Sequence, residues 1–333
     1  GVRHQLVLGG PSSERVRSSL RALRSAATVK GSTITVIGDP IEGYDFMRPP
    51  STELKRLGIR LKQLSPSELT ASQQRLRDDD TGTVRGDFLR NWTHELPKEF
   101  LEVVTRQHRI LTGLVAQHGS ASGTLNCHQR GVKSGLGEPN VAPCFALGIQ
   151  TSRGIPWTCT GDVNTSLVMM MVASLGLPTF YHEIEAVDEE TGEALLANSG
   201  EFDTRFPGLD EPLVARNPWF EGDSPTPTLR FQIAPGPATL VALATVDNRL
   251  RLISAEGEFT NRPVTEVGTM SAAFRFGGQL PEMGWESWVM AGAGHHACAT
   301  TGHIGEVLSR LANYLEIESR VASVWHQMGE ESL

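Results

Sequence analysis

The spacing of apolar residues at the start of the chain predicts a helix followed by a strand. Residues 12–27 carry Val16, Leu20 and Leu23 at helical spacing, and serines at the beginning of this stretch can cap a helix. The β-branched run at residues 30–38 (KGSTITVIG) is typical of a buried strand that ends in a turn. The chain therefore opens with alternating α and β elements.

The same alternation continues towards the middle of the chain. A short helix is predicted at residues 51–57, closed by Gly58, and a strand at 60–64. Ser65 and Glu68 then form a capping box, which predicts the start of another helix. The other elements expected in this half are a long amphipathic helix at 96–116 and strands at 125–128, 144–147 and 155–159. This βα alternation predicts a mostly parallel sheet with helices on both faces.

The run from Trp157 to Glu183 (WTCTGDVNTSLVMMMVASLGLPTFYHE) is the most informative part of the sequence. It predicts a short strand, a tight polar turn, a buried helix at residues 163–175 and a second strand that ends on a carboxylate. Acidic groups would then lie at the ends of neighbouring strands, where α/β proteins usually build their binding sites.

The pattern changes after Pro178. Segments from residue 179 to 275 are short, alternate between apolar and polar positions, and are broken by glycine and proline. Residues 240–259 form two β-rich runs around Asp247 and Asn248, which predicts a hairpin. This half is predicted to be an antiparallel barrel or sandwich, and an amphipathic helix at 304–315 is expected to pack back against it. The expected domains are residues 1–178 and 179–333.

Composition, charge and the spacing of cysteines argue against several classes of binding partner. The formal net charge of −8 argues against nonspecific binding to nucleic acid, and the arginines near the N-terminus are interpreted as a solvated helix face. The four cysteines form no CxxC pair, which favours buried thiols in a reducing cytoplasm. We see neither a signal peptide nor a run long enough to span a membrane, so no membrane partner is expected. The sequence starts without methionine, so it can be a fragment.

Three places carry candidate chemistry. In the turn Thr160-Gly161-Asp162, the aspartate either only caps the following helix or presents oxygens to a metal or a sugar. Glu183 ends a predicted strand, with His182 expected on the opposite face. His295 and His296 form an uncommon histidine pair, of which a strand would direct only one to a given site. A neutral imidazole suits a divalent metal such as Mn²⁺.

Motifs for other chemistry are missing from the sequence. It contains neither a GxxxxGK[ST] phosphate loop nor a GxGxxG turn after a strand, so nucleotide cofactors have little support. A GxSxG nucleophile elbow is missing as well.

Several motifs, in order, resemble the L-fucose/L-arabinose isomerase superfamily, specifically its shorter fucose-isomerase-like branch. The matching segments are LNCHQRG (125–131), VAPCFALG (141–148), GIPWTCTGDVNTSL (154–167), LPTFYHEIEAVDEETGEALLANSGE (177–201), FQIAPGPATLVAL (231–243), LRLISAEGEF (250–259) and WVMAGAGHHACA (288–299). The resemblance implies Rossmann-like α/β domains followed by a β-barrel-like C-terminal domain. Members usually carry a further N-terminal α/β domain that this sequence lacks, and they form homo-oligomers, trimers or hexamers.

The resemblance also implies a reaction and a site. Members interconvert an aldose and a ketose, here a pentose or deoxyhexose, through an enediol with Mn²⁺ or another divalent metal. Carried over by position, Glu183 and Asp162 are the catalytic candidates, and Glu183, His296 and Asp162 the metal ligands. Thr160, His295 and Asn198 are the candidates for substrate binding.

The sequence departs from the family pattern at two positions. It reads CTGD where members have CEGD, so Thr160 stands in place of a glutamate, and Asn198 stands where many relatives have histidine. A threonine hydroxyl is no general base near neutral pH, and losing a carboxylate weakens a site for a hard cation. Either Asp162 or Glu201 substitutes, or the chain is a catalytically impaired member that binds a sugar or a protein partner. A third hypothesis is an epimerase or lyase with a rearranged site.

Overall fold

The structure is a computed structural model. It describes residues 13–75, 93–94, 97–137, 141–220, 226–264, 267–278 and 283–322, together with positions 7 and 10. Everything below concerns these residues.

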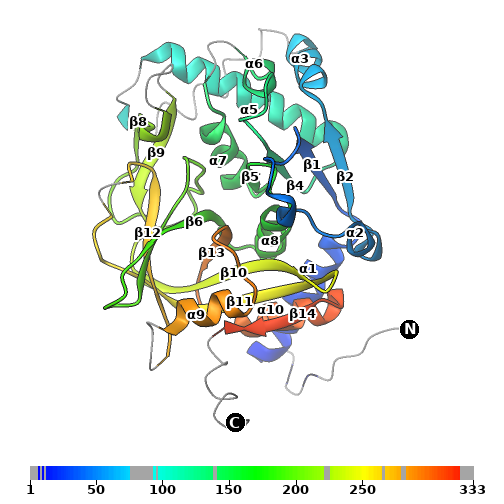
Figure 1. Ribbon diagram of the computed structural model, residues 1–333, viewed down its shortest axis with the longest axis vertical. Helices are drawn as coiled ribbons and strands as arrows, with labels where there is room; N and C mark the ends of the chain where they lie inside the picture. Colours follow the sequence, from blue (N-terminus) through cyan, green and yellow to red (C-terminus); the bar gives the residue numbers. More distant parts are fainter. Residues whose placement is uncertain are drawn as a thin grey trace.

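A four-stranded parallel sheet forms the first part of the fold, in the order β2-β1-β4-β5 (Figure 1). Its strands are β1 (Thr33–Ile37), β2 (Arg60–Leu64), β4 (Ser122–Leu125) and β5 (Trp157–Cys159). All three pairings in this sheet are parallel, so the carboxyl ends of the strands meet at one edge. The parallel sheet predicted from the βα alternation is confirmed.

The helices of this part include the predicted ones and two that the pattern did not predict, α6 and α7. They are α1 (Glu14–Val29), α2 (Ser51–Leu57), α3 (Pro66–Arg75), α5 (Lys98–His118), α6 (Val132–Gly135), α7 (Cys144–Ser152) and α8 (Val163–Ser174). The capping box is present, because Ser65 N donates to Glu68 and Glu68 N donates back to the Ser65 hydroxyl. The prediction of a strand at 144–147 is wrong, since these residues begin α7. A short apolar run that is buried on all sides has the same pattern in a helix and in a strand.

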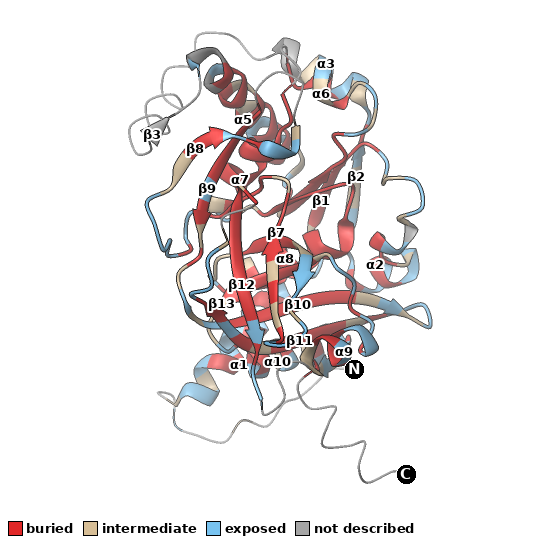
Figure 2. Cartoon of the chain, turned by 60° about the vertical axis from the view of Figure 1, so that its left-hand side comes forward, coloured by how far each residue is buried: buried red, intermediate tan, exposed pale blue. Residues whose placement is uncertain are grey.

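A closed six-stranded antiparallel barrel forms the second part (Figures 1 and 2). Around the barrel the order is β11-β10-β13-β6-β7-β12, and a further pairing of β11 with β12 closes it. The bounds are β6 (Phe180–Val187), β7 (Glu193–Ala197), β10 (Gly236–Val246), β11 (Arg249–Thr260), β12 (Met270–Phe276) and β13 (Ala297–Thr301). The predicted hairpin is β10–β11, and positive φ angles at Asp247 and Asn248 form its turn. The barrel, one of the two alternatives left open by the sequence, is therefore the observed form.

Short elements extend or cover the barrel. Strand β14 (Glu318–Val321) lies parallel to β11, and β9 (Pro227–Gln232) parallel to β12, followed by β8 (Leu213–Arg216) and β3 (Thr93–His94). The remaining described elements are the helices α9 (Gly284–Met290) and α10 (Gly305–Leu315) and the 3-10 turns η1 (Asp45–Met47) and η3 (Pro218–Phe220). The predicted C-terminal helix is thus confirmed as α10. None of the helices described here is long and apolar enough to cross a membrane.

Helix α8 lies between the parallel sheet and the barrel (Figure 1). Its first ten residues are all buried, from Val163 to Val172, and it contacts strands of both sheets. A mostly apolar helix that has no polar face turned to solvent is expected only in such a fully enclosed position.

Helix α1 buries a face that the sequence did not predict. Leu20 and Leu23 are 59% and 49% exposed, whereas the small residues on the other side of the helix, such as Ala22 and Ser25, are buried. Small side chains let α1 approach α8 closely, and the Ser25 hydroxyl donates to the Met171 carbonyl at 3.2 Å. Helical spacing was therefore predicted correctly, while the buried side was not.

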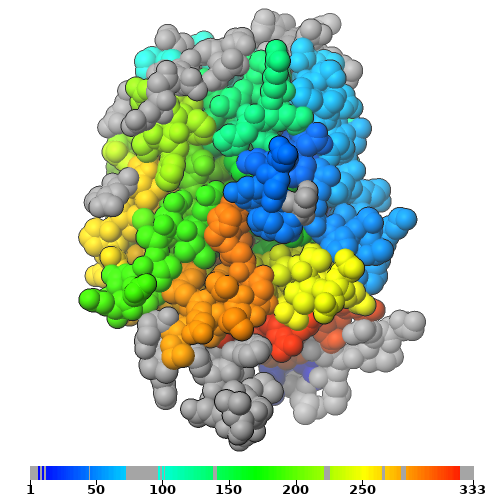
Figure 3. All heavy atoms as spheres, in the orientation of Figure 1, coloured from blue at the N-terminus to red at the C-terminus, as the bar shows by residue number. Residues whose placement is uncertain are grey.

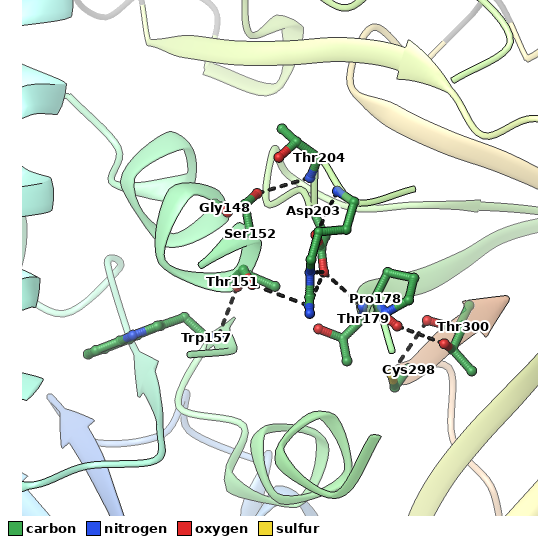
Figure 4. Close-up of polar contacts among 12 residues, drawn as sticks. Gly148, Thr151, Ser152, Trp157, Pro178, Thr179, Asp203, Thr204, Cys298 and Thr300 are labelled. Atoms are coloured by element: carbon green, nitrogen blue, oxygen red, sulfur yellow. Dashed lines mark hydrogen bonds and ion pairs between the residues drawn. The ribbon is translucent and has the colours of Figure 1, made fainter. Parts of the chain in front are cut away.

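Polar contacts centred on Asp203 join the two parts of the fold (Figure 4). This fully buried carboxylate accepts from Thr179 N at 2.9 Å, at the start of the barrel half, and pairs with Arg205. Arg205 in turn donates to the carbonyl of Thr151 in α7 at 3.4 Å. One hydrophobic cluster also contains residues from both sides of Pro178. The boundary at residue 178 stays a prediction.

The enclosed position of α8 gives a first testable prediction. We expect Leu167→Ala to lower the free energy of unfolding by about 2–5 kcal/mol, because Leu167 is fully buried and its truncation leaves a cavity. The matched control is Leu20→Ala on α1, which removes the same atoms from an exposed position and is expected to cost under about 0.5 kcal/mol. Urea unfolding monitored by circular dichroism measures both. Equal losses for the two variants would contradict this account of the core.

Candidate active site at the junction of sheet and barrel

Asp162 caps the helix that connects the parallel sheet to the barrel. Its Oδ1 accepts from Thr165 N at 2.8 Å, and its Oδ2 accepts from the Thr165 hydroxyl at 2.7 Å. The side chain is buried, as expected for a carboxylate held by helix N–H groups at the end of β5. The capping role proposed from the sequence is confirmed.

Strand pairing in the barrel brings His296 beside Glu183. Ala297 in β13 pairs with His182 in β6, and the two strands are antiparallel. The residue before Ala297 therefore lies beside the residue after His182. His296 Nε2 lies 3.4 Å from Glu183 Oε1, and His296 Nδ1 lies 3.1 Å from Asp162 Oδ2. Three of the residues singled out in the sequence therefore meet, with the imidazole between two carboxylates.

The pKa values of this trio reflect the contacts. Burial lowers the pKa of His296, but hydrogen bonds with Asp162 and Glu183 outweigh it and raise the pKa to about 9. Burial raises the pKa of Glu183, and the hydrogen bond and charge of His296 reverse this, so that the pKa lies below its ordinary value. Glu183 is therefore ionised at neutral pH, as a base or a metal ligand requires.

Two tyrosines that the sequence did not single out contact His296. The Tyr181 hydroxyl lies 3.2 Å from His296 Nδ1, and the Tyr44 ring stacks on the imidazole with centroids 6.4 Å apart. Tyr181 could have been predicted from the sequence, because residues two apart on a strand share a face and Tyr181 lies two residues before Glu183. Tyr44 could not, since only the tertiary fold brings its loop against the segment that carries His296; Figure 3 shows these blue and orange surfaces side by side.

The two adjacent histidines do not point to opposite sides. They precede β13 instead of lying within it, and their rings are 4.2 Å apart. The prediction that only one of the two histidines reaches the site assumed that both lie in a strand. This assumption is wrong, because the strand begins after them. His295 is exposed and lies close enough to Glu183 to affect its pKa.

Thr160 occupies a backbone conformation that β-branched residues rarely adopt. Its φ of 58° is left-handed, and the next residue, Gly161, has φ of 82°. The Thr160 carbonyl accepts from Ile41 N at 3.4 Å, and its hydroxyl faces the Met47 sulfur at 3.8 Å. Left-handed backbone costs roughly 1–2 kcal/mol at such a residue, a strain that is found most often at functional sites. The role of Thr160 in substrate binding stays a prediction.

Asn198 uses its amide within the fold. Its Nδ2 donates to the carbonyls of Tyr181 and Glu201, and its Oδ1 accepts from Gly200 N at 2.7 Å. The side chain is 1% exposed. Asn198 thus fixes the turn after β7 against β6, and its predicted contact with a substrate stays a prediction.

The donors fit a divalent cation only in part. Two ligands at about 2.1 Å from one cation lie about 3 Å apart when they are at right angles, close to the separation of His296 Nε2 and Glu183 Oε1. Asp162 contacts the other ring nitrogen, which points away from that position. Within the described ranges, no group of three or more His, Cys, Asp or Glu side chains is arranged to hold a metal. A two-residue site, completed by water and substrate oxygens, is what these side chains support.

His182 and Glu201 are two further buried groups, and the sequence did not predict how deeply either is buried. The sequence analysis placed His182 on the face opposite Glu183 and gave Glu201 as one possible substitute for the missing glutamate. His182 is fully buried, neither ring nitrogen has a hydrogen-bond partner among the described residues, and burial lowers its pKa to about 3. Glu201 is 2% exposed, and burial raises its pKa to about 7. Neither burial nor pairing can be read from a single sequence, because both depend on which elements pack above the residue.

Comparison with known proteins found similarity to L-arabinose isomerases. The model of the L-arabinose isomerase C-terminal domain matches residues 187–318, which are most of the barrel and α10. An L-arabinose isomerase of Nocardioides sp. (strain ATCC BAA-499 / JS614) is 24% identical over 94% of this chain and 65% of its own length. An L-arabinose isomerase of Bifidobacterium adolescentis is 20% identical over 96% of this chain and 66% of its own. The chain thus spans about two thirds of the length of these relatives.

A parallel α/β sheet joined to a closed antiparallel barrel, with carboxylates and a histidine at the joint, defines the class of fold: an α/β protein with a C-terminal barrel. The matches cover both parts of the chain. The chain is similar to members of the L-fucose/L-arabinose isomerase superfamily and corresponds to part of the length of these relatives.

The raised pKa of Glu201 predicts a pH-dependent stability. Between the ordinary pKa of 4.5 and the folded value of about 7, the unfolded chain releases this proton and the folded chain keeps it. The free energy of unfolding therefore falls as the pH rises through this window, by up to about 1.4 kcal/mol per pH unit. Because glutamine cannot ionise, we expect Glu201→Gln to gain stability relative to wild type between about pH 5 and pH 8.

Urea unfolding of both proteins across this range measures the effect. A stability difference that does not change with pH would show that Glu201 ionises alike in the folded and unfolded chains.

Proposed function

We propose that this chain carries the core of a metal-dependent aldose–ketose isomerase that acts on a pentose or deoxyhexose. The observation that supports the proposal most is the meeting of Glu183 and His296, with Asp162 behind the imidazole. Relatives named L-arabinose isomerase support the same reaction class at low identity. The alternation of β6 and the loop before β13 bring these groups to one edge of the barrel.

In the proposed reaction, the Glu183 carboxylate takes the proton from C2 of the aldose and later returns it to C1. Electrons from the broken C–H bond form the enediol, and a hydroxyl proton moves from O2 to O1. His296 would present Nε2 beside Glu183, while Asp162 accepts from Nδ1 and so fixes the orientation of the ring. Thr160, His295 and Asn198 are proposed to line the sugar.

Glu183 and His296 Nε2 would hold a divalent cation such as Mn²⁺, which would have to displace the proton that the raised pKa of His296 keeps on this nitrogen in the metal-free protein. A cation bound there supplies Lewis-acid polarisation of the sugar oxygens. Asp162 contributes by holding the imidazole, because its oxygens already accept from Thr165 and His296. A homo-oligomer, trimeric or hexameric, and a cytoplasmic location belong to the same proposal.

The proposed base gives a direct prediction. With Mn²⁺ and a panel of pentoses and deoxyhexoses, we expect aldose–ketose exchange by wild type and a loss of about 10²–10⁴ in kcat for Glu183→Gln. Proton exchange at C1 and C2, followed by NMR in D₂O, measures the reaction. Glu190→Gln changes an exposed turn carboxylate beyond the same strand and serves as the control with unchanged activity. Lack of exchange with every sugar by the full-length wild-type protein would overturn the proposal.

The alternative is an impaired member that binds a sugar or a protein partner without turnover. The observation that favours it is the two-residue donor set with Thr160 beside it. Metal analysis of the purified protein separates the two functions. Stoichiometric Mn²⁺, Co²⁺ or Zn²⁺ that is lost in His296→Ala argues for the isomerase, and lack of bound metal in wild type argues for the alternative.

A carboxylate at position 160 tests whether this residue faces the proposed cation. We expect Thr160→Glu to raise the affinity for Mn²⁺ by roughly tenfold or more, because added negative charge strengthens a site for a hard cation. Thr160→Gln has nearly the same size without the charge and is the matched control, with no gain expected. Isothermal titration calorimetry with Mn²⁺ measures both. Equal affinities for the two variants would mean that residue 160 points away from the cation.

A further inference from the structure

A loop that is fixed against the candidate site presents two aromatic rings to solvent. Tyr44 and Phe46 lie between β1 and α2, and their ring centroids are 5.5 Å apart. Tyr44 is partly exposed, and Phe46 is 57% exposed. Single exposed apolar side chains are common on protein surfaces, but this pair continues onto the imidazole of His296, whose centroid is 6.4 Å from that of Tyr44. The two rings and the site therefore form one continuous surface.

The backbone of this loop is anchored to the turn and the first residues of α8. The Phe46 carbonyl accepts from Nδ2 of the buried Asn164 at 2.7 Å. Pro40 packs so closely on Gly161 that a Cβ atom on Gly161 would lie 2.7 Å from Pro40 Cα. Met47, the next residue after Phe46, is 2% exposed. Because the loop is held at several points, its rings are already in place and a ligand does not have to order them.

A ligand that reaches Glu183 from solvent passes Tyr44. Glu183 keeps 29% of its side chain exposed, and its Oε1 lies 3.4 Å from His296 Nε2. Of the two tyrosines that contact this imidazole, Tyr181 is 1% exposed and belongs to the core, whereas Tyr44 is open to solvent. A sugar whose C1 and C2 lie at Glu183 and His296 can therefore place its remaining carbons against the Tyr44 ring.

Aromatic rings suit the part of a sugar that does not react. The C–H groups on the face of a sugar are weakly positive, and the face of an aromatic ring is weakly negative. Ligand pockets usually combine such apolar walls with a few polar groups, here Glu183 and His296. A stable protein interface buries roughly 800 Å² on each side, whereas an aromatic side chain buries about 150–250 Å². Two rings thus fit a sugar better than a protein partner.

We propose that Tyr44 and Phe46 form an aromatic platform that binds the apolar face of the sugar. The inference rests on the proposed isomerase function and adds two binding residues to it, which hold the carbons beyond C2. The platform sets the affinity for the sugar and leaves the chemical step to Glu183 and His296. Thr160, which stands in place of a glutamate, contacts the platform loop through both its carbonyl and its hydroxyl and so supports the platform.

The test measures binding without turnover. Pentitols and 6-deoxyhexitols, the reduced forms of the proposed substrates, lack the carbonyl group and cannot be isomerised. Isothermal titration calorimetry with the full-length protein and Mn²⁺ gives their Kd. We expect Tyr44→Ala and Phe46→Ala each to raise the Kd by about tenfold or more, because each removes one ring of the platform.

Two matched controls show whether the rings are responsible. Tyr44→Phe keeps the ring and removes only the hydroxyl, so its Kd is expected to stay within about threefold of wild type. Leu20→Ala removes an apolar side chain of similar exposure, 59%, from α1 and is expected to leave the Kd unchanged.

Steady-state kinetics provides a second measurement, which also decides the proposal if the alditols bind too weakly to measure. With a sugar that the wild type isomerises, we expect Phe46→Ala to raise KM by about tenfold and to keep kcat within about threefold, because the platform binds substrate and transition state alike. Wild-type thermal unfolding of Phe46→Ala, expected for an exposed side chain, shows that the fold is intact.

The outcomes separate the platform from the isomerase function. Weaker binding in both alanine variants, with both controls unchanged, supports the platform. Wild-type affinity in Phe46→Ala overturns it, and so does a loss in Tyr44→Phe as large as in Tyr44→Ala; the isomerase function stands in both cases. A changed oligomeric state of Phe46→Ala with unchanged affinity assigns the rings to an interface between copies and overturns it as well. Alditol binding by a wild type that isomerises no sugar overturns the isomerase function alone, and lack of both overturns both proposals.

Discussion

The hydrogen bond between Asp162 and His296 is the interaction on which the site depends. Asp162 belongs to the turn that starts α8, whereas His296 belongs to the loop that leads into β13. The same carboxylate caps the helix through Thr165, so helix start and imidazole orientation are fixed by one side chain. Any movement of the parallel sheet relative to the barrel would change the position of Asp162 against His296.

Helix α8 provides the rigid support for this arrangement. It is enclosed by both sheets, and its apolar residues are packed on all sides. The buried network at Asp203 fixes the same joint from the other end, where the barrel half meets α7. Because protein interiors are close-packed, side chains on the two halves can be held at hydrogen-bonding distances although they are far apart in sequence.

Two features of the site run against stability and point to function. Thr160 keeps a left-handed backbone in spite of its branched side chain, and Glu201 keeps a buried carboxyl group without a good donor. Folded proteins tolerate such local costs mainly where binding or catalysis benefits from them.

The sequence by itself determined the α/β alternation followed by a β-rich half, the hairpin at Asp247 and Asn248, the cap at Asp162 as one of two alternatives, and a resemblance to the superfamily. These depend on local backbone chemistry, on hydrophobic period and on motifs in order, all of which can be read along the chain. Tertiary structure alone decided that residues 144–147 are helical, that Leu20 and Leu23 face outward, that the two histidine rings lie together and that Glu201 is enclosed. Each of these depends on which surface packs against the residue, and a single sequence does not record that surface.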